Sequence, residues 1–338
     1  MIVVGGEALV DLVDDGVSRR AIAGGGPFNT AVALGRLGLP VAFLGAVSRD
    51  AYGQILGQLL ADAGVDTSLV GRSDLPTPRA TVHRESDGRN TYTFSLAATA
   101  FTDVSVDRLP PLPADVWAIH VGTLALAVDP PAAAYEALLD REAGARRIIL
   151  DPNVRPEIFG DVAGYRRRFE RLAGLADIVK LSADDASWIY PGLPLPDVSA
   201  LILGLGPRLV ALTCGANGAV ARSGSATVAV PGMRVLVADS VGAGDSFGAA
   251  LIAALIDEGA FGPAVEGEIA ENVLRRALTY AVAASAVTCT RTGAVPPTRV
   301  EVAAQLSAFS DGCAEAAPMQ APAAPIATSR PVDLPAVE

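Results

Sequence analysis

Short apolar runs recur along the chain, and stretches with helical character separate them. The runs cover residues 2–4, 41–47, 117–121, 148–150, 178–180 and 209–213. In the helical stretch 245–255, Phe247, Leu251 and Leu255 recur every four residues and therefore share one face. Buried strands that alternate with helices predict a mostly parallel sheet with helices on both faces, which is a three-layer α/β/α fold.

Two regions depart from this alternation. Within about 9–22 and 76–102, polar and apolar residues alternate singly, as in T-Y-T-F-S-L at 91–96. This period is typical of antiparallel strands with one solvated face. We therefore expect a small β-sheet that projects from the main domain as a lid. Such a sheet leaves apolar surface to bury, which favours a homodimer through the lid.

The chain has 338 residues, of which 51% are hydrophobic, enough for one large core. We assign residues 1–311 to a single domain. Residues 312–338 are rich in Ala and Pro and lack amphipathic periodicity, so we expect them to form a disordered tail.

Composition argues against several classes of function. The net charge of −11 disfavours nucleic-acid and anionic-membrane partners, because both require a basic face. Three cysteines without a C-x-x-C pair, and two histidines, indicate neither a disulfide framework nor a zinc site. We find no signal peptide and no apolar window of about 18 residues, so the expected location is the cytoplasm. Lys180 is the only lysine, which leaves no Walker A Gly-Lys pair.

The run D-S-V-G-A-G-D at 239–245 is the strongest functional signal. Its glycines allow a sharp turn and a close approach of the backbone to a ligand. The helix that follows offers free N–H groups and the positive end of its dipole to an anion. Asp245, in the first helical turn, can accept a proton from a hydroxyl group beside that anion, and phosphoryl transfer to an alcohol needs both parts. Taken alone, the run fits equally well an ordinary turn whose aspartate favours the helix dipole.

The same run resembles the D-T-x-G-A-G-D signature of the ribokinase-type (PfkB-type) carbohydrate kinases, with Ser240 in place of threonine. Other segments similar to motifs of this family follow in the family's order over about residues 2–310. They are G-E-A-L-V-D (6–11), G-G-G-P-F-N-T-A (24–31), G-A-V-S-R-D-A-Y-G (45–53), D-P-N-V-R-P (151–156), K-L-S-A-D-D (180–185) and T-C-G-A-N-G (213–218). The resemblance implies a ribokinase-like fold and an ATP-dependent sugar kinase.

The resemblance also implies roles for the matching residues. Asp245 would be the general base on the sugar hydroxyl group, and the backbone of Gly242, Ala243 and Gly244 would form an anion hole for the transferred phosphoryl group. The expected substrate-binding residues are Asp11, Gly26, Asn29, Asn153 and Arg155. The expected ATP-binding residues are Lys180, Ser182, Thr213, Gly215, Gly218, Gly242 and Gly244. For Arg155 the residues leave two interpretations open, namely contact with a ligand anion or an ion pair with a neighbouring loop.

The expected cofactor is Mg²⁺. The family's Asn-x-x-Glu motif becomes Ser182-x-x-Asp185 here, and Asp185 would act near the metal through water, because Mg²⁺ tends to keep several waters. Family members often also use potassium near the segments that match Asp239 and residues 291–294. A K⁺ requirement therefore stays open.

Several segments resemble fructokinases in particular, namely 6–11, 24–38, 120–126 and 151–156. The nearest competitor is 2-keto-3-deoxygluconate kinase, whose acidic substrate usually meets an arginine of the lid. Leu96 stands at that place, which favours a neutral sugar. We therefore expect transfer of the ATP γ-phosphoryl group to the 6-hydroxyl of fructose. Ribokinase or 2-keto-3-deoxygluconate kinase activity, and a catalytically silent sugar- or nucleotide-binding protein, are the alternatives.

Overall fold

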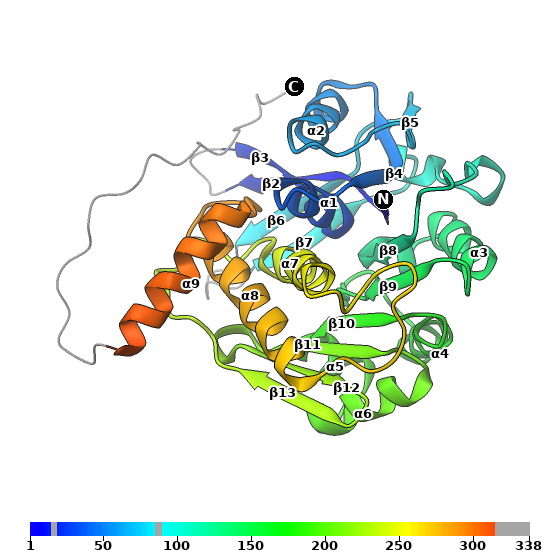
Figure 1. Ribbon diagram of the computed structural model, residues 1–338. Coiled ribbons are helices and arrows are strands. Elements are labelled where there is room, and N and C mark those ends of the chain that lie inside the picture. Colours follow the sequence, from blue (N-terminus) through cyan, green and yellow to red (C-terminus); the bar gives the residue numbers. More distant parts are fainter. Residues whose placement is uncertain (15–18, 85–89, 315–338) are drawn as a thin grey trace.

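A nine-stranded sheet forms the centre of the computed structural model, which describes residues 1–14, 19–84 and 90–314 (Figure 1). The strand order is β13-β12-β11-β10-β9-β8-β1-β4-β5. The strands are β1 (Ile2–Gly5), β4 (Val41–Ser48), β5 (Val70–Ser73), β8 (Ala118–Gly122), β9 (Arg147–Asp151), β10 (Ile178–Ser182), β11 (Leu209–Thr213), β12 (Ala219–Ser223) and β13 (Ala226–Val230). Neighbours from β11 to β5 pair in parallel, and β12 and β13 add an antiparallel edge. The predicted mostly parallel sheet is confirmed.

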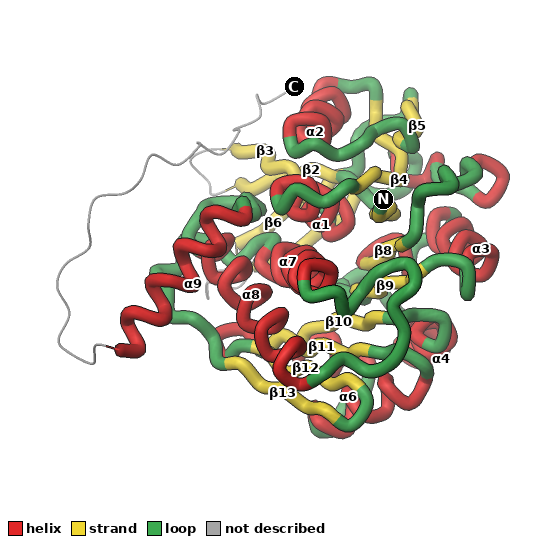
Figure 2. Tube along the Cα trace, viewed as in Figure 1, coloured by secondary structure: helices red, strands yellow, loops and turns green. Residues whose placement is uncertain are grey.

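Helices lie on both sides of this sheet (Figure 2). One face carries α1 (Gly26–Arg36), α2 (Ala51–Asp62), α7 (Ala243–Asp257), α8 (Glu271–Cys289) and α9 (Arg299–Ala314), and the other carries α3 (Pro131–Glu142), α4 (Val162–Ala173), α5 (Ala183–Ile189) and α6 (Leu195–Leu205). In β1, Ile2 and Val4 belong to one core cluster and Val3 to the other, because successive residues of a strand point to opposite faces. The predicted three-layer fold is confirmed.

The apolar runs predict the buried strands, but they miss β5, β12 and β13. The reason is their position near the edges of the sheet. In β5 the two middle residues, Gly71 and Arg72, are exposed, and in β12 fully buried residues alternate with partly buried ones. Their apolar runs are absent in β5 and short in β12 and β13, where polar residues interrupt them.

A separate four-stranded sheet, with the order β3-β2-β6-β7, stands where the lid is expected. Its strands are β2 (Leu9–Asp14), β3 (Arg19–Gly24), β6 (Arg79–Arg84) and β7 (Asn90–Ser95). Two hairpins are antiparallel as predicted, but β2 and β6 pair in parallel. The long crossover through α1, β4, α2 and β5 allows this direction. The homodimer through the lid stays a prediction.

The C-terminal helix α9 continues to Ala314, beyond the expected domain boundary at residue 311. The rest of the predicted tail, residues 315–338, and the lid residues 15–18 and 85–89 lie outside the described residues. No helix in the described part of the chain is long and apolar enough to cross a membrane.

The carboxyl ends of the parallel strands lie next to one another along the same end of the main sheet. Gly5 pairs with Val121 in the next strand, and Gly122 pairs with Asp151. Ser182 and Thr213 form another such pair at the ends of β10 and β11. Parallel sheets of this kind bind ligands beyond the carboxyl ends of their strands.

Candidate active site

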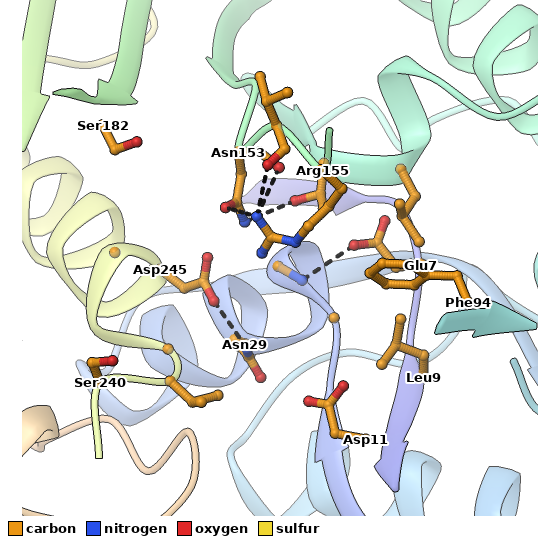
Figure 3. A pocket seen from close by; sticks show the side chains of 18 of the residues that line it. Glu7, Leu9, Asp11, Asn29, Phe94, Asn153, Arg155, Ser182, Ser240 and Asp245 are labelled. Atoms are coloured by element: carbon orange, nitrogen blue, oxygen red, sulfur yellow. Dashed lines mark hydrogen bonds between the residues drawn. The ribbon is translucent and has the colours of Figure 1, made fainter. Parts of the chain in front are cut away.

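A cavity of about 830 Å³ opens at the carboxyl ends of the main strands and beneath the lid. Segments far apart in the sequence line it. The lid contributes Leu9, Asp11, Arg20, Ile22 and Phe94, the strand ends contribute Glu7, Thr123, Asn153, Arg155, Ser182 and Asp185, and the start of α7 contributes Ser240, Gly242, Gly244 and Asp245. Figure 3 shows how these side chains converge. This volume is typical of a site for small molecules.

The predicted anion hole lies at the start of α7. Gly242 precedes the helix in a left-handed conformation with φ of 74°. Gly242 and Gly244 line the cavity, and within the described residues no hydrogen-bond acceptor is found for their backbone N–H groups. Ala243 differs, because it does not line the cavity and its N–H donates to the Ser240 carbonyl at 3.2 Å. The geometry therefore leaves two glycine N–H groups for an anion.

Asp245 follows in the first turn of α7 and is buried at the cavity wall. The Asn29 amide, from α1, donates to Asp245 Oδ2 at 2.9 Å (Figure 3). Burial raises the pKa of Asp245, while the positive charge of Lys180 and the Asn29 hydrogen bond oppose this rise. A buried carboxylate with a raised proton affinity beside an anion hole is suited to act as a general base.

Gly26 at the start of α1 allows three elements to meet at the floor of the cavity. A Cβ atom on this residue would lie 2.3 Å from Thr123 Oγ1 and 2.8 Å from Asn153 Nδ2, so a larger residue does not fit. The Asn153 amide donates to Thr123 Oγ1 at 3.1 Å. Thr123 and Asn153 both have positive φ, of 55° and 37°, a rare conformation that clusters at functional sites.

Arg155 also lines the cavity (Figure 3). Its Nη1 donates to Asn153 Oδ1 at 2.8 Å and to the carbonyl groups of Asn153 and Val154. Within the described residues it forms no ion pair, so the geometry favours contact with a ligand over pairing with a neighbouring loop. Asp11 lies in the same cavity, where burial raises its pKa to about 6 and the charge of Arg155 opposes the rise.

Comparison with known families assigns the chain to one of them. The model of the pfkB family carbohydrate kinases matches residues 2–300. The chain belongs to this family. A fructokinase from Rhizobium leguminosarum bv. trifolii is 40% identical over 260 residues, which cover 75% of this chain and 79% of the relative. The protein is thus a carbohydrate kinase, as the resemblance of its motifs implied.

Solved structures of carbohydrate kinases share the fold over nearly the whole chain. A fructokinase from Xylella fastidiosa with bound ATP has a TM-score of 0.79 and 27% identity, and the match covers 91% of this chain and 98% of the other. A fructokinase from Vibrio cholerae O395 with fructose, ADP and calcium has a TM-score of 0.78 and 27% identity, over 90% and 98% of the two chains. The ribokinase-like fold is confirmed.

Among the expected ATP-binding residues of this carbohydrate kinase, Lys180 lies behind the cavity. Its side chain is buried, and its Nζ donates to Asp151 Oδ2 at 2.8 Å. A Cβ atom on Gly244 would lie 3.1 Å from the same Nζ, so the ammonium group lies directly under the anion hole. Burial alone would lower the pKa of Lys180, but the charge and hydrogen bond of Asp151, together with the charges of Asp245 and Asp185, outweigh it and raise the pKa, which keeps the lysine charged. Lys180 therefore places a positive charge beneath the N–H groups of the two glycines.

Ser182 and Asp185 lie on the cavity wall, but they bind each other. They form a capping box at the start of α5, with the Ser182 N–H and hydroxyl donating to Asp185 Oδ2 at 2.8 and 2.7 Å. Asp185 Oδ1 accepts the Val154 N–H at 2.7 Å. Both oxygens of Asp185 thus position the protein backbone, and the neighbouring Asp184 is the exposed carboxylate on this wall.

The remaining predicted nucleotide residues surround the end of β11, outside the cavity lining. Thr213 ends the strand, and Gly215 begins a short turn with positive φ of 54°. Gly218 is buried, and a Cβ atom there would lie 2.1 Å from the Val230 carbonyl. Gly218 therefore allows this loop to pack on β13.

Sequence reasoning assigned no role to several residues of the cavity. Glu7, Leu9, Phe94, Thr123 and Asp184 all line it. The alternation within 91–96 indicates that Phe94 lies on one face of a strand, but not which face is turned toward a ligand. Glu7 could have been found from the sequence, because it follows a buried strand and a glycine. A carboxylate at such a buried position needs a partner.

Proposed function

We propose that the protein is a fructokinase that transfers the γ-phosphoryl group of ATP to the 6-hydroxyl of D-fructose. The observation that carries this proposal is the buried Asp245, held by Asn29 beside the N–H groups of Gly242 and Gly244. The identity with the Rhizobium fructokinase supports the choice of sugar.

The reaction follows from the position of these groups. The acceptor hydroxyl lies against Asp245, which takes its proton as the oxygen attacks the γ-phosphorus. A bond forms between this oxygen and phosphorus, the bond from the γ-phosphorus to the bridging oxygen breaks, and ADP leaves. The N–H groups of Gly242 and Gly244 stabilise the negative charge on the transferred group, with the α7 dipole and Lys180 behind them.

The charges around the cavity support a neutral sugar over a sugar acid. Carboxylates of Asp11, Asp184 and Asp245 line the cavity, and the cationic side chains on its wall are Arg155 and the exposed Arg20, within the described residues. A carboxylate on the substrate would be repelled by the acidic groups. Leu9, Phe94 and Leu124 offer an apolar surface for the C–H groups of a sugar.

Magnesium would reach this site together with ATP and neutralise part of its phosphate charge. No group of three His, Cys, Asp or Glu side chains is placed to hold a metal within the described residues. This fits an ion that keeps waters and binds mainly to phosphates. We place Asp185 and the exposed Asp184 next to those waters, because Asp185 Oδ1 accepts only one hydrogen bond and Asp184 also lines the cavity. A potassium requirement stays a prediction.

Asp245→Asn tests the proposal. We expect its kcat with fructose and Mg-ATP to fall by about 10²–10⁴-fold, because the amide cannot accept the proton, while the Kd for ATP stays within a few-fold. Asp257→Asn, on the exposed end of the same helix, is the matched control. ADP release is measured with fructose, ribose and 2-keto-3-deoxygluconate. Near-normal turnover by Asp245→Asn, or a kcat/KM that is higher for another sugar than for fructose, contradicts the proposal.

A further inference from the structure

Glu7 lies at the end of β1 with its side chain in the wall of the cavity, and the mechanism above does not use it. It is 1% exposed. Its Oε1 accepts the Gly26 N–H at 3.2 Å. Its Oε2 is also buried, and within the described residues it has no hydrogen-bond partner. A buried polar atom without a partner is costly, and because Glu7 is among the residues that line the cavity, a bound ligand is the partner that we consider for this oxygen.

The ionisation of Glu7 follows from its surroundings. Burial raises its pKa to about 8, the charge of Arg155 opposes the rise, and the charge of Asp245 adds to it. Tyr135, from α3, interacts electrostatically with Glu7, but its hydroxyl group donates its hydrogen bond to the Leu44 carbonyl. Glu7 therefore keeps its proton at neutral pH, which makes the oxygen without a partner, Oε2, a hydrogen-bond donor.

Glu7 and Asp245 lie on opposite sides of Arg155 in the cavity (Figure 3). Leu9 and Phe94 line the same cavity and suit the apolar faces of a sugar. A group in this position meets the substrate away from the hydroxyl that reacts at Asp245. A carboxylic acid that offers one donor and one acceptor matches a hydroxyl group, which has the same two functions.

We propose that Glu7 is a specificity-determining residue, whose protonated carboxyl group donates a hydrogen bond to a sugar hydroxyl other than the one that is phosphorylated. This inference rests on the proposed function, because it requires a sugar in this cavity. It assigns Glu7 to substrate binding and not to the chemical step. Its removal therefore raises the KM for the sugar more than it lowers kcat.

The substitutions Glu7→Gln and Glu7→Ala show whether Glu7 acts as a neutral hydrogen-bond donor or as a charged acceptor. The Gln side chain keeps a donor at the outer position, so we expect Glu7→Gln to retain kcat/KM for fructose within about fivefold of the wild type. Glu7→Ala loses the donor, and we expect its KM for fructose to rise by about 10–100-fold with kcat within a few-fold. Glu271→Ala, exposed on α8, is the matched control. Circular dichroism and the Kd for ATP check that each variant is folded.

Two further readouts tie the effect to a proton and to one hydroxyl group. The wild-type KM for fructose should rise above a pH of about 8, as Glu7 loses its proton, while that of Glu7→Gln should not. A set of monodeoxy-fructoses should include one analogue that wild type and Glu7→Ala use equally well. The wild-type pH profile and these analogues test the proposal even where a variant does not fold.

Some outcomes overturn the inference. If Glu7→Gln loses as much as Glu7→Ala, a charged carboxylate is required, and if Glu7→Ala keeps its KM, Glu7 does not contact the sugar. Failure of the proposed function looks different, because the wild type would then prefer another sugar. The Gln and Ala variants would still test Glu7 with that sugar.

Discussion

Asp245 acts as a base only if the groups around it balance the effect of its burial. Burial raises its pKa, and Lys180, Asn29 and Arg155 each oppose the rise. Lys180 differs from the other two because it lies behind the anion hole and has a partner of its own in Asp151. A positive charge near a carboxylate lowers the pKa by roughly 1–3 units. The only lysine of the chain therefore opposes the effect of burial on Asp245 and favours its ionised form.

Lys180→Met removes this charge and keeps a side chain of similar length. We expect the acid limb of the kcat–pH profile to move to higher pH by about 1–2 units, because the pKa of Asp245 rises further. At pH 7, kcat should fall by about 10–100-fold. Steady-state rates between pH 5.5 and 9 measure this shift.

Asp151, the ion-pair partner of Lys180, needs a control of its own, because Lys180→Met leaves it buried without a counter-charge. The double variant Asp151→Asn/Lys180→Met removes both charges and should regain thermal stability, which shows that the loss of stability in Lys180→Met comes from the unpaired Asp151. An acid limb at the wild-type pH in the folded single variant Lys180→Met would mean that Lys180 does not act on Asp245.

Helix α7 depends on the turn that precedes it. The Asp239 carboxylate accepts the Val241 N–H at 3.1 Å and the Gly293 N–H at 2.9 Å, which ties the turn to the loop after α8. A Cβ atom on Gly242 would lie 2.6 Å from the Ala294 Cβ. The direction of the free N–H groups is therefore set by contacts between two segments distant in the chain.

Gly242→Ala should disturb the anion hole in two ways, through its left-handed backbone and through the contact with Ala294. The backbone alone costs about 1–2 kcal/mol for a residue with a Cβ atom. We expect kcat to fall by more than about tenfold, with little change in the KM for fructose. The double variant Gly242→Ala/Ala294→Gly relieves the contact and should recover part of the rate. An unchanged kcat in the single variant would argue against a role of this turn.

The sequence predicts the elements better than it predicts their contacts. The segment 209–212 is apolar throughout because this part of β11 is buried on both faces, so its strand could be found. The run 239–245 likewise identified the start of a helix. The hydrogen bond of Ala243, the inward direction of Lys180 and the position of Glu7 could not be found in this way. They depend on which distant segments become neighbours, and local patterns do not carry this information.

The whole molecule brings two sheets together around one cavity. Leu9 and Leu96 from the lid share a core cluster with Leu124, which follows β8 in the main domain. The chemical groups on α7 belong to the main domain, while Asp11 and Phe94 belong to the lid. The lid therefore lines the cavity together with the main domain, and under the proposed function we expect it to help bind the sugar and to exclude water from the phosphoryl group.

Phe94→Ala tests this second contribution. Loss of a partly buried phenyl group should raise the KM for fructose by about 10–100-fold, which corresponds to the ~1.5–3 kcal/mol that burial of such a side chain provides. Water should also enter the cavity more easily, so ATP hydrolysis without sugar should rise relative to sugar phosphorylation. Thr93→Ala is the matched control, because Thr93 is exposed on the same strand and points to its other face. Phosphate release and ADP release are measured side by side with and without fructose. If both rates in Phe94→Ala match those of the control, the lid does not seal the site through this residue.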